Sequence, residues 1–263
     1  MNAVSLLYHD VVSSGDWDFI GFRGPGTSRY KLALPEFEKH LAAIAGVRTA
    51  KPARASEISH AAADDFPFLL TFDDGGESAY TCIAGLLDRY GWPAHFLVTA
   101  GYIGTPGFLN AAQIRSLRDC GHVIGSHSFS HPQRMSHLPS AQLLEEWTRS
   151  VQVLSDILGE PVTSASVPRG FYSRKVAEAA SLAGIRVLFT SEPTTRIQNV
   201  HGCLVIGRFT LFQGMPPAVS ADLVSPHSRN RRQQWLFWNL KKIFKFLGGE
   251  LYLRARDRLL NKT

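Results

Sequence analysis

The stretch LLTFDDGGES, residues 69–78, places two aspartates directly after an apolar run. The run PFLLTF has the length and composition of a buried β-strand, and two glycines follow the acidic pair. Adjacent carboxylates repel each other, so Asp73 and Asp74 need a reason to stand at this strand end. One interpretation is a helix N-cap with an acidic first turn, ahead of a helix predicted over 77–90. That interpretation explains one acid well and the pair poorly.

Strand-like and helix-like segments alternate along the rest of the chain. Apolar runs predict strands at 4–9, 67–72, 94–100, 122–127, 162–168, 185–191 and 204–211. Helical periodicity predicts helices at 34–44, 77–90, 110–121, 139–159 and 173–184. Repeated strand–helix units indicate an α/β fold with a mainly parallel sheet. About seven strands over this length fit a barrel-like α/β domain.

The composition is that of an ordinary globular protein, but the charge is unevenly distributed. The chain has 263 residues, 44% hydrophobic and 19% charged, with a net charge of +6. Residues 225–263 hold ten Lys and Arg against two acidic residues, a net +8, which leaves −2 for residues 1–224. We therefore expect a catalytic domain over 1–224 and a basic tail over 225–263. A nucleic-acid partner is not expected, because the basicity belongs to the tail alone.

Cysteine usage and the first residues favour a cytoplasmic protein. The three cysteines are far apart and form no C-x-x-C pair, which predicts reduced thiols. The opening MNAVSLLYHDVV has no positively charged region and too short an apolar run for a signal peptide. No later run reaches the roughly 18 apolar residues of a transmembrane helix.

Polar groups of one kind follow three of the predicted strands. TFDD ends one strand, SHSFSHP follows another, and YHD ends the first. Chemistry in such folds gathers at the carboxyl ends of the strands. His127 and His131 are four residues apart, which lets two imidazoles reach one ion, although H-x-x-x-H alone is common in loops. With an acidic pair at another strand end, Asp plus two His forms a competent set for a divalent metal.

A divided role explains both aspartates. One carboxylate binds the metal, and the other takes a proton from water whose pKa the ion has lowered. The ion also offsets the repulsion between the neighbouring carboxylates.

Two motifs in this order resemble a known family. TFDDG at 71–75 together with HSFSH at 127–131 is similar to the polysaccharide deacetylases, carbohydrate esterase family 4, also called the NodB homology domain. GWPAHFLVTAG at 91–101 resembles the strand between the two motifs. The resemblance covers roughly residues 1–212 and implies a distorted (β/α) barrel with metal-dependent N-deacetylase activity.

Carried over by position, the resemblance assigns individual roles. It implies that Asp73 is the general base and that Asp74, His127 and His131 are the metal ligands. It implies a divalent ion, with Zn²⁺ expected first and Co²⁺, Ni²⁺ or Fe²⁺ as alternatives.

The family's third motif departs from the pattern here. That motif has an Arg just before a proline, and the Arg orients the catalytic base, whereas SVPRGFYS at 166–173 has Val167 in that place. Arg169 either substitutes for it or is a solvated loop charge. The loop with Arg169, Gly170 and Phe171 is expected to line the site and to help hold the oxyanion.

The family's last motif, Leu-x-His, is absent from CLVIGRFTLFQG at 203–214. Leu7 and His9 in LLYHD form this pattern at the other end of the domain, as in exopolysaccharide-type deacetylases whose motif order resembles a circular permutation. In a closed barrel the first and last strands are neighbours, so His9 can occupy the vacated place. We expect His9 to protonate the leaving amine, against the alternative of a structural histidine.

The tail has the pattern of a basic amphipathic helix. Apolar residues recur at helical spacing at Leu236, Phe237, Leu240, Ile243, Phe244, Leu247 and Leu251. Lys241, Lys242 and Lys245 lie mostly off that stripe. The pattern fits a membrane-surface anchor or, equally, a helix packed across the barrel with solvated lysines.

The expected function is N-deacetylation of an amino sugar in a glycan or glycolipid of envelope or exopolysaccharide synthesis. A lipid-linked sugar at the inner membrane face would fit the basic tail and the cytoplasmic character. Two alternatives stay open: a catalytically silent glycan-binding domain, and a hydrolase of O-acetyl esters or non-sugar amides with the same fold.

Overall fold

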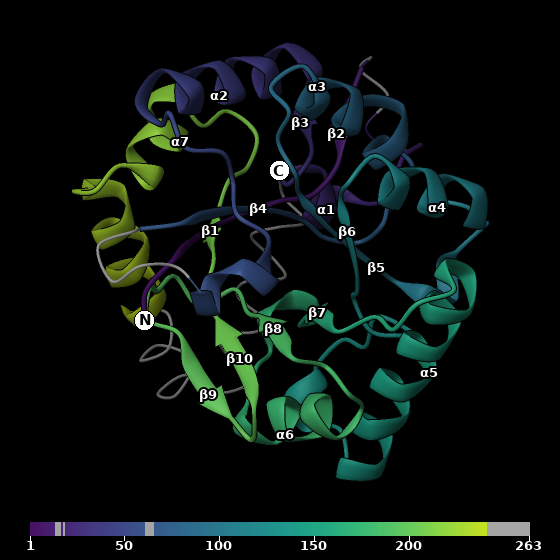
Figure 1. The fold of residues 1–263 in the computed structure, drawn as a ribbon. Coiled ribbons are helices and arrows are strands. Elements are labelled where there is room, and N and C mark those ends of the chain that lie inside the picture. Colours follow the sequence, from purple (N-terminus) through teal and green to yellow (C-terminus); the bar gives the residue numbers. More distant parts are fainter. Residues whose placement is uncertain (14–16, 18, 61–65, 241–263) are drawn as a thin grey trace.

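A curled sheet forms the centre of the protein (Figure 1). The computed structural model describes residues 1–13, 17, 19–60 and 66–240. Within them the main sheet has nine strands in the order β11-β1-β4-β5-β6-β7-β8-β10-β9. The strands are β1 (Val4–Tyr8), β4 (Phe68–Phe72), β5 (His95–Val98), β6 (Val123–Ser126), β7 (Ser164–Ser166), β8 (Val187–Phe189), β9 (Gln198–Val200), β10 (Cys203–Ile206) and β11 (Phe209–Thr210). All neighbours in this sheet are parallel except β10 and β9.

One bent strand joins the two ends of the curled sheet. β10 pairs with β8, and β11 pairs with β1, yet only Gly207 and Arg208 separate β10 from β11. The chain therefore passes from β10, which lies beside the edge strand β9, to the opposite edge of the sheet within two residues. This bend brings the first strand and the last parallel strand together, as the sequence predicted for a barrel.

Helices surround the outside of the sheet (Figure 1). The longer ones are α2 (Leu34–Val47), α4 (Ala111–Asp119), α5 (Ser140–Leu158), α6 (Arg174–Leu182) and α7 (Pro217–Val224). Shorter elements are α1 (Pro25–Ser28), α3 (Ala84–Asp88), the π-helical turn η2 (Ala79–Ile83), the 3-10 turns η1 (Ala55–His60), η3 (Ala100–Tyr102), η4 (Met135–His137) and η5 (Pro168–Gly170), and the pair β2 (Val11–Val12) and β3 (Leu32–Ala33).

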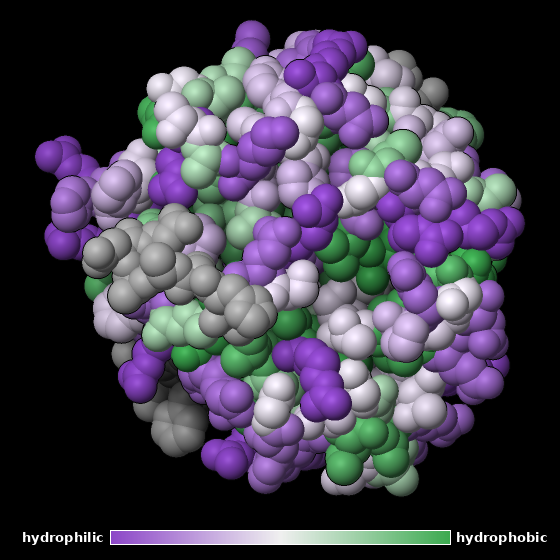
Figure 2. Space-filling model, viewed as in Figure 1, coloured by the Kyte–Doolittle hydropathy of each residue, from purple (hydrophilic) through white to green (hydrophobic). Residues whose placement is uncertain are grey.

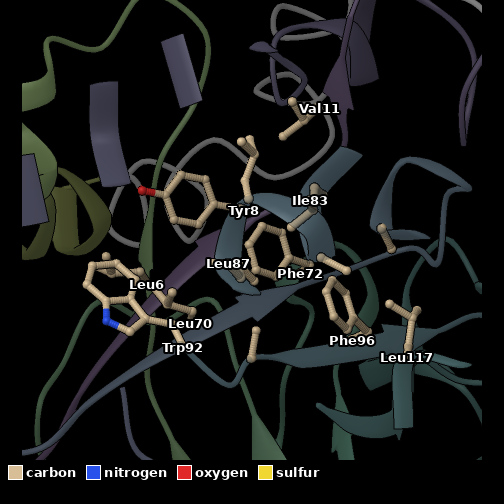
Figure 3. Close-up of a cluster of buried hydrophobic side chains, with 14 of the residues drawn as sticks. Leu6, Tyr8, Val11, Leu70, Phe72, Ile83, Leu87, Trp92, Phe96 and Leu117 are labelled. Carbon is tan, nitrogen blue, oxygen red and sulfur yellow. The ribbon is translucent and has the colours of Figure 1, made fainter. Parts of the chain in front are cut away.

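Side-chain alternation divides the core into an outer and an inner part. Leu6 and Tyr8 of β1 and Phe72 of β4 belong to the large outer cluster under the helices (Figure 3). The Tyr8 ring stacks on Phe72 with centroids 5.5 Å apart. Leu69 of β4 points the other way, into a smaller inner cluster. Because successive strand residues face opposite sides, the residues that follow Leu69 at two-residue steps also point into the barrel.

Most predicted elements are confirmed, and the differences concern short pieces. The predicted strand 204–211 is two strands, β10 and β11, and the predicted helix 77–90 is η2 followed by α3. β2, β3, β9 and α7 were not predicted. Strands of two or three residues show no periodicity in sequence and are therefore hard to predict. With β9 added and 204–211 divided in two, the main sheet has nine strands among the described residues instead of the seven predicted.

The surface is mostly polar, and the described part of the tail is helical. Figure 2 shows the face viewed in Figure 1 as largely hydrophilic, with hydrophobic patches between the polar side chains. No helix among the described residues is both long and apolar enough to cross a membrane. Residues 229–240 are helical, and their yellow turns lie at the left edge of Figure 1. The predicted tail residues 241–263 lie outside the described residues, so the proposed boundary at 224/225 stays a prediction.

Candidate metal centre and catalytic site

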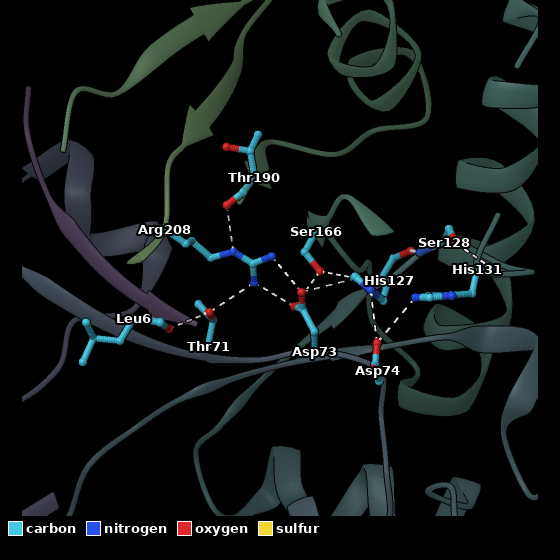
Figure 4. A network of polar contacts seen from close by, with 11 residues as sticks. Leu6, Thr71, Asp73, Asp74, His127, Ser128, His131, Ser166, Thr190 and Arg208 are labelled. Carbon is cyan, nitrogen blue, oxygen red and sulfur yellow. Dashed lines mark hydrogen bonds and ion pairs between the residues drawn. The ribbon is translucent and has the colours of Figure 1, made fainter. Parts of the chain in front are cut away.

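The predicted site residues meet at the carboxyl ends of the central strands (Figure 4). Asp73 and Asp74 follow β4, and His127 and His131 follow β6. Asp73 continues the inward alternation of Leu69 and Thr71. His127 reaches the same point because β5 alone separates β4 from β6 in the sheet. Residues 54 positions apart in sequence thus share one end of the barrel.

Asp74, His127 and His131 form a set that suits a divalent metal ion. Nε2 of His127 lies 3.4 Å and Nε2 of His131 3.5 Å from Oδ1 of Asp74. One ligand atom from each of the three lies within 4.8 Å of the others. Two ligands bound about 2.1 Å from one ion at a tetrahedral angle are about 3.4 Å apart, so these separations fit a shared ion. Two imidazoles and one carboxylate leave coordination positions open for water and substrate.

Backbone strain is concentrated at this set. Asp74, Ser128 and His131 all have positive φ, at 76°, 65° and 57°. Such conformations cost of order 1–3 kcal/mol each and persist where the surroundings impose them. Hydrogen bonds within the histidine loop hold Ser128 and His131 in this conformation. The hydroxyl oxygen of Ser128 accepts the backbone N–H of His131, and the hydroxyl oxygen of Ser126 accepts the backbone N–H of Ser128.

A glutamate from α5 also holds the histidine loop. One carboxylate oxygen of Glu146 accepts the backbone N–H groups of Phe129 and Ser130 at 3.0 and 2.9 Å. The other carboxylate oxygen of Glu146 accepts a hydrogen bond from the hydroxyl group of Ser130 at 2.6 Å. The loop between the two histidines is therefore fixed from outside the barrel by a helix side chain.

Asp73 does not join the metal set but pairs with a buried arginine. The guanidinium of Arg208 donates to Oδ1 and Oδ2 of Asp73, both at 2.7 Å. Nε of Arg208 donates to the carbonyl of Thr190, and one of the two terminal nitrogens of its guanidinium also donates to Oγ1 of Thr71. Arg208 is completely buried, and it stands at the bend between β10 and β11. The bent strand that closes the sheet thus delivers the group that orients Asp73.

This pairing resolves the missing arginine of the third motif. The prediction left open whether Arg169 takes that place, but Arg169 is exposed and lies near His131, where its charge acts on the imidazole. The side chain of Val167 belongs to the outer core, so that position does not face Asp73. The residue of this segment that faces Asp73 is Ser166, whose hydroxyl donates to Oδ1 at 2.9 Å.

Ser166 also links Asp73 to the metal set. Its Oγ lies 2.5 Å from Nδ1 of His127. When Nε2 of His127 faces a metal, Nδ1 carries the proton and donates it to Ser166, which in turn donates to Asp73. The contact therefore fixes the tautomer that leaves Nε2 free to act as a ligand.

The electrostatics divide the two aspartates. Burial alone would raise the pKa of Asp73, but Arg208 and His127 outweigh it and hold the pKa below its ordinary value. Burial would also raise the pKa of Asp74, and His127 and His131 hold it well below the ordinary range. Both carboxyl groups are therefore ionised at neutral pH, each stabilised by different partners.

Comparison with known proteins finds similar sequences over the residues of this site. The sequence profile of the polysaccharide deacetylases matches residues 61–188, which include both aspartates and both histidines. YxkH of Bacillus subtilis (strain 168), described as a putative polysaccharide deacetylase, is 26% identical over 216 residues, which are 80% of this chain and 71% of that protein. Over these residues the chain is similar to the polysaccharide deacetylases.

Further known proteins match shorter parts of the chain or its fold alone. The peptidoglycan-N-acetylmuramic acid deacetylase PdaA of Bacillus subtilis (strain 168) is 29% identical over 124 residues, 46% of this chain and 45% of PdaA. The deacetylase PplD of Streptococcus pyogenes has a TM-score of 0.71 at 17% identity, covering 86% of this chain and 99% of PplD. IcaB from Ammonifex degensii has a TM-score of 0.68 at 23% identity, covering 85% of this chain and 97% of IcaB.

His9 faces the same end of the barrel. It follows β1 and is half-buried, with its ring 5.0 Å from that of Tyr30. Burial lowers the pKa of His9, while the charges of Asp74 and Asp73 act in the opposite direction. Nδ1 of His9 has no hydrogen-bond partner among the described residues. The general-acid role stays a prediction, as does the permuted motif order on which it rests.

Asp10, beside His9, has a structural setting. Oδ1 of Asp10 accepts Oγ of Ser78 at 2.7 Å, and Gly21 and Gly76 pack against the carboxylate so closely that a Cβ at either would collide with it. Burial raises the pKa of Asp10 to about 7. Its hydrogen bond holds the turn after β4 rather than the imidazole of His9.

For the other predicted lining residues, Leu7, Gly170 and Phe171, the contacts described are backbone hydrogen bonds outside the metal set. Leu7 is buried in β1, where its carbonyl accepts the N–H of Leu211. The N–H groups of Gly170 and Phe171 donate within their own loop, to the carbonyls of Val167 and Pro168, at 3.4 Å each. These long bonds leave the predicted oxyanion role untested.

An aromatic side chain that was not predicted from the sequence, Phe22, packs against the metal set. The Phe22 ring lies 4.4 Å from that of His131 and edge-on to Phe108 at 5.1 Å. Phe22 and Tyr30 come from the segment between β2 and α2, which crosses the catalytic end. No local pattern in that segment indicated the site, because its contacts are set only by the fold.

Proposed function

We propose that this chain is a metal-dependent hydrolase that removes N-acetyl groups from an amino sugar in a glycan or glycolipid. The observation that carries the proposal is the division of the aspartates. Arg208 holds Asp73 ionised next to a set of Asp74, His127 and His131 that can bind a divalent ion. Similarity to a family of deacetylases supports the hydrolytic reaction, and PdaA and the chitin deacetylase of Pestalotiopsis sp, 27% identical over 180 residues, support an N-acetyl sugar.

The reaction is amide hydrolysis, with water as the nucleophile. A divalent ion, when bound, supplies a Lewis acid that polarises the acetyl carbonyl and lowers the pKa of water. The water oxygen forms a bond to the acetyl carbon, Asp73 accepts the water proton, and the carbon–nitrogen bond then breaks. His9 gives a proton to the departing nitrogen, so the products are acetate and the free amino sugar. Arg208 keeps the Asp73 oxygens fixed and unprotonated before each turnover.

The proposal extends to the metal, the substrate and the location. Zn²⁺ is the preferred ion because two imidazoles and one carboxylate suit it, and Co²⁺, Ni²⁺ or Fe²⁺ could use the same ligands. A lipid-linked sugar of envelope or exopolysaccharide synthesis, met at the cytoplasmic face of the membrane, fits the basic, apolar tail. The alternative of a silent glycan-binding domain rested on the missing third-motif arginine, and Arg208 removes that reason.

Acetate release tests the function. Wild type with added Zn²⁺ or Co²⁺ should release acetate from chitooligosaccharides, peptidoglycan fragments or lipid-linked N-acetyl sugars, and a chelator should stop it. Asp73→Asn and His9→Ala should each lower kcat/KM by about 10²- to 10⁴-fold, because each removes a proton-transfer group. His201→Ala changes an exposed histidine far from the site and serves as the control.

Three outcomes would contradict parts of the proposal. Full activity in His9→Ala would exclude His9 as the acid. Release from acetylxylan or a small amide, but not from N-acetyl sugars, would favour the hydrolase of other acyl groups. Tight metal binding without acetate release from any substrate would favour the silent binding domain.

A further inference from the structure

The helix of residues 229–240 presents its apolar side to solvent. Trp235, Leu236, Phe237 and Leu240 are 51%, 53%, 68% and 51% exposed. Leu236 and Leu240 are one turn apart, and Phe237 is next to them, so they share one face of the helix. Large apolar side chains that gather on one exposed face indicate a surface that is covered by a partner.

The opposite side of the same helix holds it to the barrel through polar groups. Gln234 donates to the carbonyl of Thr210 and accepts its N–H, at 3.0 and 3.1 Å, and so completes the hydrogen bonding of β11. Arg231 donates to the carbonyls of Leu223 and Ser225. Trp238 lies one turn beyond Gln234 on this side. The sequence left open whether the apolar stripe faces the barrel, and over 229–240 it does not.

Positive charge lies beside the apolar face. A hollow of about 560 Å³ at the start of the helix is lined by Arg229, Arg231, Arg232, His227 and Trp235, together with residues of the 193–195 segment. None of the described residues that line it is acidic. The sequence from 225 to 263 carries a net +8, while the rest of the chain carries −2. An apolar stripe next to exposed arginines such as Arg229 and Arg232 is the pattern of a helix that binds an anionic surface.

We propose that the helix 229–240 docks on an anionic lipid bilayer, with Leu236, Phe237 and Leu240 entering the headgroup region and Arg229 and Arg232 contacting lipid phosphates. A second copy of this chain is the less favoured occupant, because it would bring two strongly positive surfaces together. A bilayer with anionic lipids instead supplies both the apolar layer and the compensating charge.

The helix also connects the docking face to the catalytic end. The Trp238 ring packs at Gly170 of η5, so close that a Cβ at Gly170 would lie 3.4 Å from it. The loop at Gly170 follows β7, the strand that carries Ser166. Docking would therefore hold the loop at Gly170, at the edge of the site, next to the membrane and expose this loop to lipid-linked sugars. This consequence rests on the proposed function, whereas the docking itself does not.

Vesicle binding by the full chain tests the docking without any activity measurement. Co-sedimentation should show binding to vesicles of phosphatidylcholine with phosphatidylglycerol, weaker binding to phosphatidylcholine alone, and a loss as salt is raised. The variant L236S/F237S/L240S should weaken binding by at least about tenfold, and R229E/R232E should do so mainly on the anionic vesicles. All five positions are exposed, and circular dichroism melting should confirm an unchanged fold.

A matched control separates the helix face from general surface hydrophobicity. Leu182 and Leu144 are exposed on α6 and α5, so L144S/L182S removes apolar surface elsewhere and should bind vesicles as wild type does. Unchanged vesicle binding in L236S/F237S/L240S would overturn the proposal. So would a wild-type dimer by light scattering that becomes a monomer in this variant while neither binds vesicles. Because vesicle binding is independent of turnover, loss of deacetylation in the assays above would leave this result standing.

Discussion

At the scale of single residues, Asp73 is a carboxylate where burial favours the neutral acid. Two strong hydrogen bonds from a buried guanidinium reverse that preference, and they also fix both oxygens in direction. The neighbouring Asp74 reaches the same ionised state through two imidazoles. A base must be ionised to accept a proton, so the lowered pKa of Asp73 favours its proposed role as a base at neutral pH.

Arg208→Gln should move the acid limb of the pH profile. Without the guanidinium, burial would dominate and raise the pKa of Asp73, so kcat/KM should begin to fall at a higher pH than in wild type. The maximal kcat/KM should also fall, by about 10²-fold or more, because the base loses its orientation. Steady-state rates across pH 4 to 9 would measure both effects.

The controls for Arg208 address folding and the competing arginine. Breaking a buried pair typically costs about 3–5 kcal/mol of stability, so Arg208→Lys, which keeps the charge but loses the bidentate geometry, should be measured alongside. Arg169→Gln should leave the acid limb in place, whatever it does to substrate affinity. A shifted limb in Arg169→Gln and not in the Arg208 variants would reassign the partner of Asp73.

At the scale of elements, α5 supports the metal set from outside the barrel. Its buried face, with Leu143, Trp147 and Leu154, packs against the sheet, and this fixes the position of Glu146 over the histidine loop. The loop needs such support because Ser128 and His131 adopt positive φ. A helix side chain thus stabilises strained backbone that carries a predicted ligand.

Glu146→Ala should weaken metal binding while the fold persists. Loss of outer partners of metal ligands typically costs about 10- to 100-fold in affinity, because the ligand then occupies several orientations. Calorimetric titration of Zn²⁺ into metal-free protein would measure the change. Glu145→Ala, an exposed neighbour on the same helix, is the matched control. Equal Zn²⁺ affinity in wild type and Glu146→Ala would show that the loop holds its shape unaided.

At the scale of the whole molecule, closure of the sheet depends on the bend at Gly207 and Arg208. The N–H of Arg208 donates to the carbonyl of Glu192, which holds the bend against the chain after β8. A Cβ on Gly207 would lie 2.3 Å from that carbonyl oxygen. Only glycine fits here, and the same two residues both join the two sides of the sheet and orient Asp73, the proposed base.

Gly207→Ala should therefore lower both stability and activity. Overpacking at a buried site typically costs about 1–3 kcal/mol, and the backbone shift would displace Arg208. Gly46→Ala is the contrasting variant, since Gly46 lies on an exposed part of α2 with open space around it, and alanine should raise stability by about 0.5–1 kcal/mol. Urea unfolding gives both free energies. A Gly207→Ala protein as stable and active as wild type would mean that the bend tolerates a side chain.

The sequence alone was enough to predict the strand–helix order and the convergence of Asp73, Asp74, His127 and His131. These depend on local periodicity and on one rule, that parallel strands bring their carboxyl ends together. Short strands such as β2 and β9 were not predicted, because two or three residues carry no periodic signal.

Only the tertiary structure decided which arginine serves Asp73 and which way the tail helix faces. Arg208 is 135 residues from Asp73, and nothing in the sequence around Arg208 marks it as the partner of Asp73. The stripe of Leu236, Phe237 and Leu240 has the same period whether it faces the barrel or the solvent. Periodicity fixes which residues share a face, but the hydrogen bonds of Gln234 and Arg231 with the barrel determine where that face points.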